Sequence, residues 1–193
     1  MKTFKFSILA SLIIGLFSLS ACSDDDAPPA ENEEEVIDQV TLIFTPTGGA
    51  PLTFSAEGEG GVNFTIPTIS LDANTEYALS VEVRNTAEGE NITEEIDAEA
   101  EEHMFFYGWT NGLFSDPSGD GNIGPNSRSD DVNYNDQDAN GYPVGLSTTW
   151  TTGDAATGEF RLILKHQPDI KTATSTSNDG ESDIDLVWDI EIQ

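Results

Sequence analysis

The sequence is poor in cysteine, histidine and basic residues, and each shortage narrows the functions open to the chain. Its 193 residues include one cysteine, two histidines and seven lysines and arginines against 36 aspartates and glutamates, a formal net charge of −29 at pH 7. One cysteine leaves no pair for a disulfide and no set of thiolates for a metal. The acids repel nucleic acid and anionic lipid head groups, so neither is expected as a partner. They suit a solvated surface or the capture of cations.

Catalytic motifs and long apolar segments are missing as well. The sequence has no Gly-x-Ser-x-Gly nucleophile motif, no glycine-rich phosphate loop and no His-Glu-x-x-His. Carboxylates are so numerous that no pair stands out as the acid and base of a glycosidase. We therefore predict a protein that is not an enzyme. Beyond the first residues, no apolar run is long enough to span a bilayer.

The first residues have the pattern of a secretory signal. Lys2 and Lys5 precede an apolar stretch over residues 6–19, and the small residue Ala21 directly precedes Cys22. A small residue before a cysteine at this point resembles a bacterial lipobox. The resemblance implies cleavage before Cys22 and lipid on its thiol and amine, which leaves no free thiol for catalysis or redox chemistry. Two or three acyl chains would hold the protein firmly on a membrane.

These features divide the chain into three parts. Residues 1–21 are predicted to be a lipoprotein signal peptide. Residues 22–35 are rich in Ser, Asp, Pro and Glu without apolar periodicity, which predicts an acidic, disordered tether. The remaining residues, 36–193, are enough for one domain with a sizeable core.

Short runs of β type follow one another through this domain. Leu79, Val81 and Val83 alternate with polar residues, and the apolar residues of 183–192 do the same, which is typical of strands buried on one side. Turn residues separate the runs, and helical patterns between them are missing. An all-β, antiparallel β-sandwich of immunoglobulin-like character is predicted rather than a parallel α/β sheet. The expected strands are 39–45, 52–56, 62–66, 77–84, 104–109, 146–151, 160–166 and 183–192.

The acid-rich segment 93–103 breaks the rhythm of strands. Thr93 is suited to cap a short helix, whereas Ile96, Ala98 and Ala100 also alternate as they would in a strand. The helix is the favoured interpretation.

Residues 112–145 form a long acidic loop region that contains half of a calcium-binding motif. Residues 136–141 match D-x-[DN]-x-[DN]-G, in which alternate residues direct oxygens at a common centre. The predicted calcium ligands are Asp136, Asp138, Asn140 and the backbone carbonyl of Tyr142. The alternative is a turn in which these side chains bond their own backbone.

The second half of the motif is not present. Its twelfth position is Ser147 where a bidentate glutamate is expected, so the segment is not an EF-hand, and Asp130 and Asp131 are candidates for the remaining ligands. A looser match begins at Asp116 and includes Asp120 as a further calcium ligand, with a plain flexible turn as the alternative.

The two histidines suggest a different kind of metal site. His103 follows Glu102, and His166 ends an expected strand shortly before Asp169. If the two strands are neighbours, both imidazoles and one carboxylate would suit zinc, copper or iron(II). The alternative is a pair of hydrogen-bonded structural histidines. Nearby acids would raise the pKa of His103 if its side chain is exposed.

Aromatic residues gather in and beside the long loop region. They would stack on a flat ligand if exposed, but packing within the protein is favoured because aromatic side chains supply much of the apolar burial in a core. The residues are Tyr107, Trp109, Phe114, Tyr134, Tyr142 and Trp150.

Several motifs resemble those of surface lipoproteins. The acidic run 23–26 after Cys22 is similar to the export signal of Bacteroidota lipoproteins, which implies the outer leaflet of the outer membrane. Glu102-His103, residues 136–146 and His166-Gln167-Pro168 resemble small flavobacterial lipoproteins that are often labelled with a type 1 periplasmic binding fold and encoded near TonB-dependent receptors. That label implies two α/β lobes, which conflicts with the antiparallel pattern.

Together these features give a functional hypothesis. The chain is a lipid-anchored surface protein that captures or presents a metal ion or small nutrient beside an outer-membrane receptor, with structural calcium. The alternative is a structural or adhesive surface module without a transported ligand.

Overall fold

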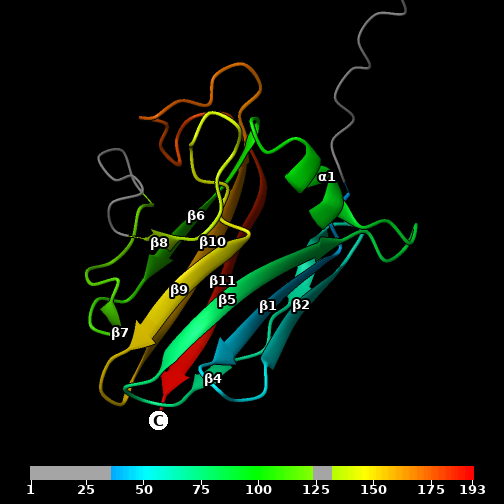
Figure 1. Cartoon of the computed structure of the whole chain (residues 1–193). Helices are drawn as coiled ribbons and strands as arrows, with labels where there is room; N and C mark the ends of the chain where they lie inside the picture. The colour runs from blue at the N-terminus through cyan, green and yellow to red at the C-terminus, as the bar shows by residue number, and fades with distance from the viewer. Residues whose placement is uncertain (1–35, 124–131) are drawn as a thin grey trace, which may run out of the picture. The chain divides into compact units, whose positions relative to one another are not determined.

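Two β-sheets account for most of the domain (Figure 1). The computed structural model describes residues 36–123 and 132–193, so the signal peptide, Cys22, the tether and the acids at 130 and 131 lie outside the described residues. The first sheet has the order β3-β2-β1-β5-β9-β7, and β8 also pairs with β9. Its strands are β1 (Gln39–Pro46), β2 (Leu52–Glu59), β3 (Val62–Thr65), β5 (Glu76–Arg84), β7 (Phe114–Asp116), β8 (Asn133–Tyr134) and β9 (Ser147–Thr152).

The second sheet has the order β4-β11-β10-β6. Its strands are β4 (Ile69–Leu71), β6 (His103–Trp109), β10 (Ala156–His166) and β11 (Glu181–Ile192). All pairs in both sheets are antiparallel except β4 with β11. The predicted all-β sandwich is therefore confirmed.

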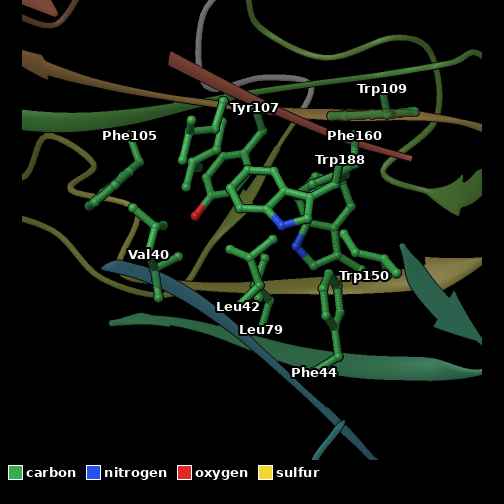
Figure 2. Packing of buried hydrophobic residues seen from close by; sticks show 14 of the residues in the cluster. Val40, Leu42, Phe44, Leu79, Phe105, Tyr107, Trp109, Trp150, Phe160 and Trp188 are labelled. Atoms are coloured by element: carbon green, nitrogen blue, oxygen red, sulfur yellow. The ribbon is translucent and has the colours of Figure 1, made fainter. Parts of the chain in front are cut away.

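The core lies between the two sheets, where the apolar side of each strand is buried. In β5 and β11 every second side chain is buried, as the alternation predicts. Figure 2 shows large side chains from both sheets meeting in this layer. Trp150 packs edge-on against Trp109 at 4.9 Å and against Phe160 at 5.3 Å between ring centroids. The aromatics Tyr107, Trp109, Phe114 and Trp150 therefore belong to the core, and the packing interpretation is confirmed for them.

Strand β6 is buried on both faces, because part of the long loop region covers the face that points away from the main core. Its residues Phe105, Tyr107 and Trp109 face the main core. On the other face, Met104 and Phe106 form a small second cluster with Ile163, against which Ile123 and Tyr134 of the loop region pack. The loop region thus covers an apolar strand.

The eight predicted strands are all present, with small changes at their ends. Three short strands, β4, β7 and β8, were not predicted, and two of them lie within the region predicted as loop. The predicted helix is confirmed as α1 (Ile92–Ala98), which is shorter than expected, since residues 99–102 form a turn and His103 begins β6. Ile92 and Ile96 are the buried residues that hold α1 against the domain.

Candidate functional site

The two histidines meet at one end of the sandwich. His103 begins β6, His166 ends β10, and the two residues are direct partners in the antiparallel register. Their rings stack with centroids 4.7 Å apart and planes inclined by 19°. The condition on which the paired site depended, that the two strands are neighbours, is confirmed. Figure 1 shows the green, yellow and orange loops gathered at this end, which we call the loop end.

His103 is buried, with 3% of its surface exposed. Its Nδ1 lies 3.2 Å from the carbonyl oxygen of Glu99, and because a carbonyl only accepts, Nδ1 carries the proton and Nε2 keeps its lone pair in the neutral ring. Burial lowers the pKa of His103, and the bond to Glu99 and the nearby carboxylates only partly offset it. The expectation of a raised pKa, which assumed an exposed ring, does not apply.

Glu102 is the carboxylate next to the imidazoles. Its Oε2 lies 3.4 Å from Nε2 of His166, and its side chain is 42% exposed while that of His166 is 8% exposed. The backbone holds this pair in place because the N–H of Gln167 donates to the carbonyl of Glu102 at 2.6 Å. Asp169, the other carboxylate considered, lies on an exposed turn.

A buried ion pair lies directly behind the histidines. Nζ of Lys171 is 3.0 Å from Oδ2 of Asp138, and the two side chains are 1% and 0% exposed. The ammonium also donates to the carbonyl of Ala100 at 2.6 Å and to that of His103 at 2.8 Å. The ammonium thus has one ion-pair partner and two hydrogen-bond acceptors. Lys171 therefore joins the start of β6 to the segment predicted to bind calcium.

Asp138 itself folds the calcium-like segment. Its Oδ1 accepts the N–H groups of Asn140 and Tyr142, both at 2.9 Å. Burial opposes ionisation of Asp138, but these N–H groups and Lys171 outweigh it and lower its pKa. The side chain thus forms the backbone-bonded turn that was the alternative to calcium.

The other predicted calcium ligands of this segment also have partners within the protein. Asp136 accepts the N–H groups of Gly145 at 2.9 Å and Ser147 at 3.1 Å, and burial raises its pKa. The carbonyl of Tyr142 accepts the N–H of Asp138, and the side-chain amide of Asn140 donates to Glu101. Within residues 36–123 and 132–193, no three His, Cys, Asp or Glu side chains form a group that could hold a metal ion. Calcium binding stays a prediction from the sequence, and the internal bonds of these carboxylates argue against it.

The second calcium-like segment lies elsewhere. Asp116 in β7 accepts a hydrogen bond from Asn133, and the carbonyl of Asp120 accepts the N–H of Trp109 at the far end of β6 from His103. At roughly 3.3 Å per residue, the two ends of β6 are about 20 Å apart. Asp120 is therefore separated from the loop end.

The structure thus unites two predictions made separately and adds residues that they missed. Glu102, His103, His166 and the segment 136–142 share the loop end. Lys171 and Gln167 hold it together, and the side-chain amide of Gln167 donates to the carbonyl of Asp179 at 2.9 Å. The sequence contains one hint of a role for Lys171, the scarcity of basic residues. With only seven lysines and arginines, a buried carboxylate has few possible partners, but the sequence does not indicate which pair forms.

The loop end offers imidazole nitrogens and a half-exposed carboxylate on a rigid scaffold, and no activated nucleophile is among these groups. Comparison of the chain with protein-family models, curated proteins and solved structures gives no match. The resemblance to flavobacterial lipoproteins therefore rests on its motifs alone. Within the described residues, no helix is long and apolar enough to cross a membrane.

Proposed function

We propose that this chain is a non-enzymatic, lipid-anchored surface protein of the outer membrane that binds its ligand at Glu102, His103 and His166. One observation carries the proposal: two imidazoles from neighbouring strands stack at 4.7 Å, with a carboxylate 3.4 Å from one of them. The site stands on the ends of two paired strands, the inner strand β10 and the edge strand β6, which suits a rigid binding site. The signal-like start of the sequence supports the anchor, and the motif resemblance supports a TonB-dependent receptor as partner.

A transition metal ion is the ligand that these donor groups suit best. Imidazole nitrogen with carboxylate oxygen is a common ligand set for zinc and copper. The lowered pKa of His103 favours its neutral, metal-binding form at neutral pH. An imidazole lone pair lies in the plane of its ring, so two nearly parallel rings direct their lone pairs along separate lines. Glu102, His103 and His166 as placed do not form a group that could hold a metal ion, so binding one ion through both rings requires a rotation of at least one ring.

A second candidate function is a structural or adhesive surface module without a transported ligand. The observation that favours it is the internal bonding of the loop end. The ammonium of Lys171 has three oxygen partners, and Asp136 accepts two backbone N–H groups. Such a network holds the loops in place without a bound ion. Calcium forms no part of either proposal, because the carboxylates predicted to bind it serve this network.

Calorimetric titration of the mature chain with ZnCl₂ and with CuCl₂ separates the two functions. The binding proposal expects one ion per chain and an affinity at least about tenfold weaker in each of His103→Gln, His166→Gln and Glu102→Gln. Glu101→Gln is the matched control, because it changes a neighbouring acid and keeps an acceptor for Asn140. If neither metal binds, or if the double histidine variant binds as the wild type does, the structural module is the better description.

A further inference from the structure

Among the described residues, one edge of the second sheet has no partner strand along half of its length. β4 pairs with β11 only where Ile69–Leu71 lies beside Ile190–Ile192. From Ile184 to Asp189, no strand of the described residues lies on that side of β11, which leaves roughly 20 Å of strand edge. Figure 1 shows β4 alongside the C-terminal end of β11 only. An open edge presents backbone N–H and carbonyl groups to which another strand can pair.

The opposite edge of the same sheet is closed, which makes the contrast informative. The outer side of β6 bonds to the long loop region: Trp109 donates to the carbonyl of Asp120, and Tyr107 donates to the side chain of Asn122. The N–H of Phe105 donates to Val144 in the same way. The fold covers one edge with its own chain and leaves the other uncovered in the described residues.

An apolar groove runs beside the open edge. It has a volume of about 410 Å³ and lies between β3 with its turn, residues 61–66, and residues 183–186 of β11. Ile184 and Leu186 are buried at its floor, 4% and 9% exposed. Phe64 and Ile66 are the partly buried residues on its other wall. Inward-facing side chains of a strand added to β11 would therefore meet apolar surface.

The outward face of the same edge carries two aspartates, one on each side of the exposed Val187. Asp185 and Asp189 point away from the core, and Asp189 lies directly opposite Glu159 of β10, a like-charge pair that a cation would relieve. The nearby Arg161 binds Asp185 with two hydrogen bonds, at 2.7 and 2.6 Å. A second copy of this chain would bring the same acids to the edge, so the charges disfavour self-pairing.

We propose that the open edge of β11 and its groove bind an extended segment of a partner protein in which apolar and basic residues alternate. Successive side chains of a strand point to opposite faces. The apolar ones would enter the groove between β3 and β11, and the basic ones would lie over Asp189 and Glu159. Backbone hydrogen bonds to the edge supply affinity, and the alternation supplies specificity. This site is separate from the loop end and does not depend on metal binding.

Peptide binding to the mature chain tests the proposal, measured by fluorescence anisotropy at physiological salt. The probe is a fluorescein-labelled heptapeptide of alternating lysine and valine. The matched peptide has the same composition but groups its valines together, so that net charge is equal. The alternating peptide is expected to bind at least about tenfold more tightly, because only its register places all valines on one face. Equal affinities would show attraction by charge alone and overturn the proposal, as would absence of binding.

Methylation of the peptide backbone tests the edge itself. Two alternating peptides carry N-methyl groups on odd or on even residues, which removes the N–H donors from one side or the other. A strand paired to β11 uses donors on one side only, and reversing the strand direction exchanges the two sides. Each of these peptides therefore keeps one usable edge, and at least one of them is expected to bind, whereas a peptide methylated on every residue has no donor and is expected to lose binding. Binding by the fully methylated peptide, or loss of binding by both alternately methylated peptides, would exclude edge pairing.

Protein variants locate the groove and the charges. Ile66→Ala removes part of the groove wall and is expected to weaken binding roughly tenfold. Ile123→Ala, a partly buried isoleucine at a different groove, is expected to leave binding unchanged. A weaker affinity in both, or in neither, would contradict this location.

The charge test uses two double variants with the same change in net charge. Glu159→Gln/Asp189→Asn lies on the proposed surface, whereas Glu95→Gln/Asp97→Asn lies on α1. Only the first is expected to weaken binding, by several-fold, and to reduce its dependence on salt. Equal effects of the two would assign the attraction to overall charge and overturn the proposed orientation of the peptide.

Discussion

Replacing Lys171 with methionine is the sharpest test of how the loop end is held. Methionine keeps most of the apolar stem and removes the ammonium. The carbonyls of Ala100 and His103 lose a donor, and Oδ2 of Asp138 accepts no other hydrogen bond among the described residues. The variant would therefore leave a carboxylate buried without its counter-charge.

The expected cost follows from the burial of the pair. Because the two side chains are 1% and 0% exposed, solvent screening does not reduce the interaction. Breaking a buried ion pair by removing one partner costs about 3–5 kcal/mol. The matched control is Arg161→Met, which breaks the ion pair with Asp185. That pair is closer, at 2.6 Å, but its side chains are 42% and 45% exposed, so its loss should cost about 0–1 kcal/mol.

Equilibrium unfolding in urea measures both variants, and its pH dependence adds a second readout. The pKa of Asp138 is lowered from the ordinary value of 3.8 in the folded protein, so its ionised form stabilises the fold above that value. This stabilisation is lost as the pH falls through the folded pKa. The deficit of Lys171→Met should therefore be largest near neutral pH and shrink in acid. A cost below about 1 kcal/mol, or one independent of pH, would refute a stabilising role for this pair.

Three further predictions concern other parts of the chain. Cys22→Ala should abolish incorporation of radiolabelled palmitate and release the protein from membranes, and continued labelling would contradict the lipobox interpretation. Excess EDTA should leave the melting temperature unchanged, since Asp136 and Asp138 already have partners within the protein, whereas a lower melting temperature in EDTA would show that calcium stabilises the fold. Asp38→Ala should lower the free energy of unfolding by about 2 kcal/mol, since this buried carboxylate accepts two N–H groups and a hydroxyl from Thr86 and Ala87. The pKa of Asp38 is lowered because these bonds outweigh its burial. The stabilisation by ionised Asp38 should therefore disappear as the pH falls through the folded pKa. Urea unfolding at pH 7 and in acid measures both the loss in the variant and its pH dependence.

The sandwich could be predicted because the signal for each long strand is local. In β5, Leu79, Val81 and Val83 are buried and their neighbours are not, which a period of two in the sequence already indicates. The short strands carry no such signal. β4 has three residues and β8 has two, too few to show an alternation, and their positions depend on partners far away in the sequence.

The candidate site could be predicted only as a conditional statement. From the sequence, His103 directly precedes an expected strand and His166 ends another. Whether the two side chains meet depends on the register of β6 against β10, which a shift of one residue would change. Lys171 contacts Asp138, a residue far from it in the sequence, and no pattern along the chain indicates that pair. The burial that lowers the pKa of His103 likewise comes from the fold and not from its acidic neighbours in sequence.

The calcium-like segment shows what a local motif can and cannot specify. Its spacing of carboxylates, carbonyls and glycine predicts oxygens that converge on a positive charge. In the structure, oxygens at the loop end do converge on one, the ammonium of Lys171, which Asp138 contacts together with the carbonyls of Ala100 and His103. Of the four predicted ligands, however, only Asp138 contacts this cation, because Asp136, Asn140 and Tyr142 bond to other parts of the protein. The motif therefore does not specify which cation and which of its oxygens would meet.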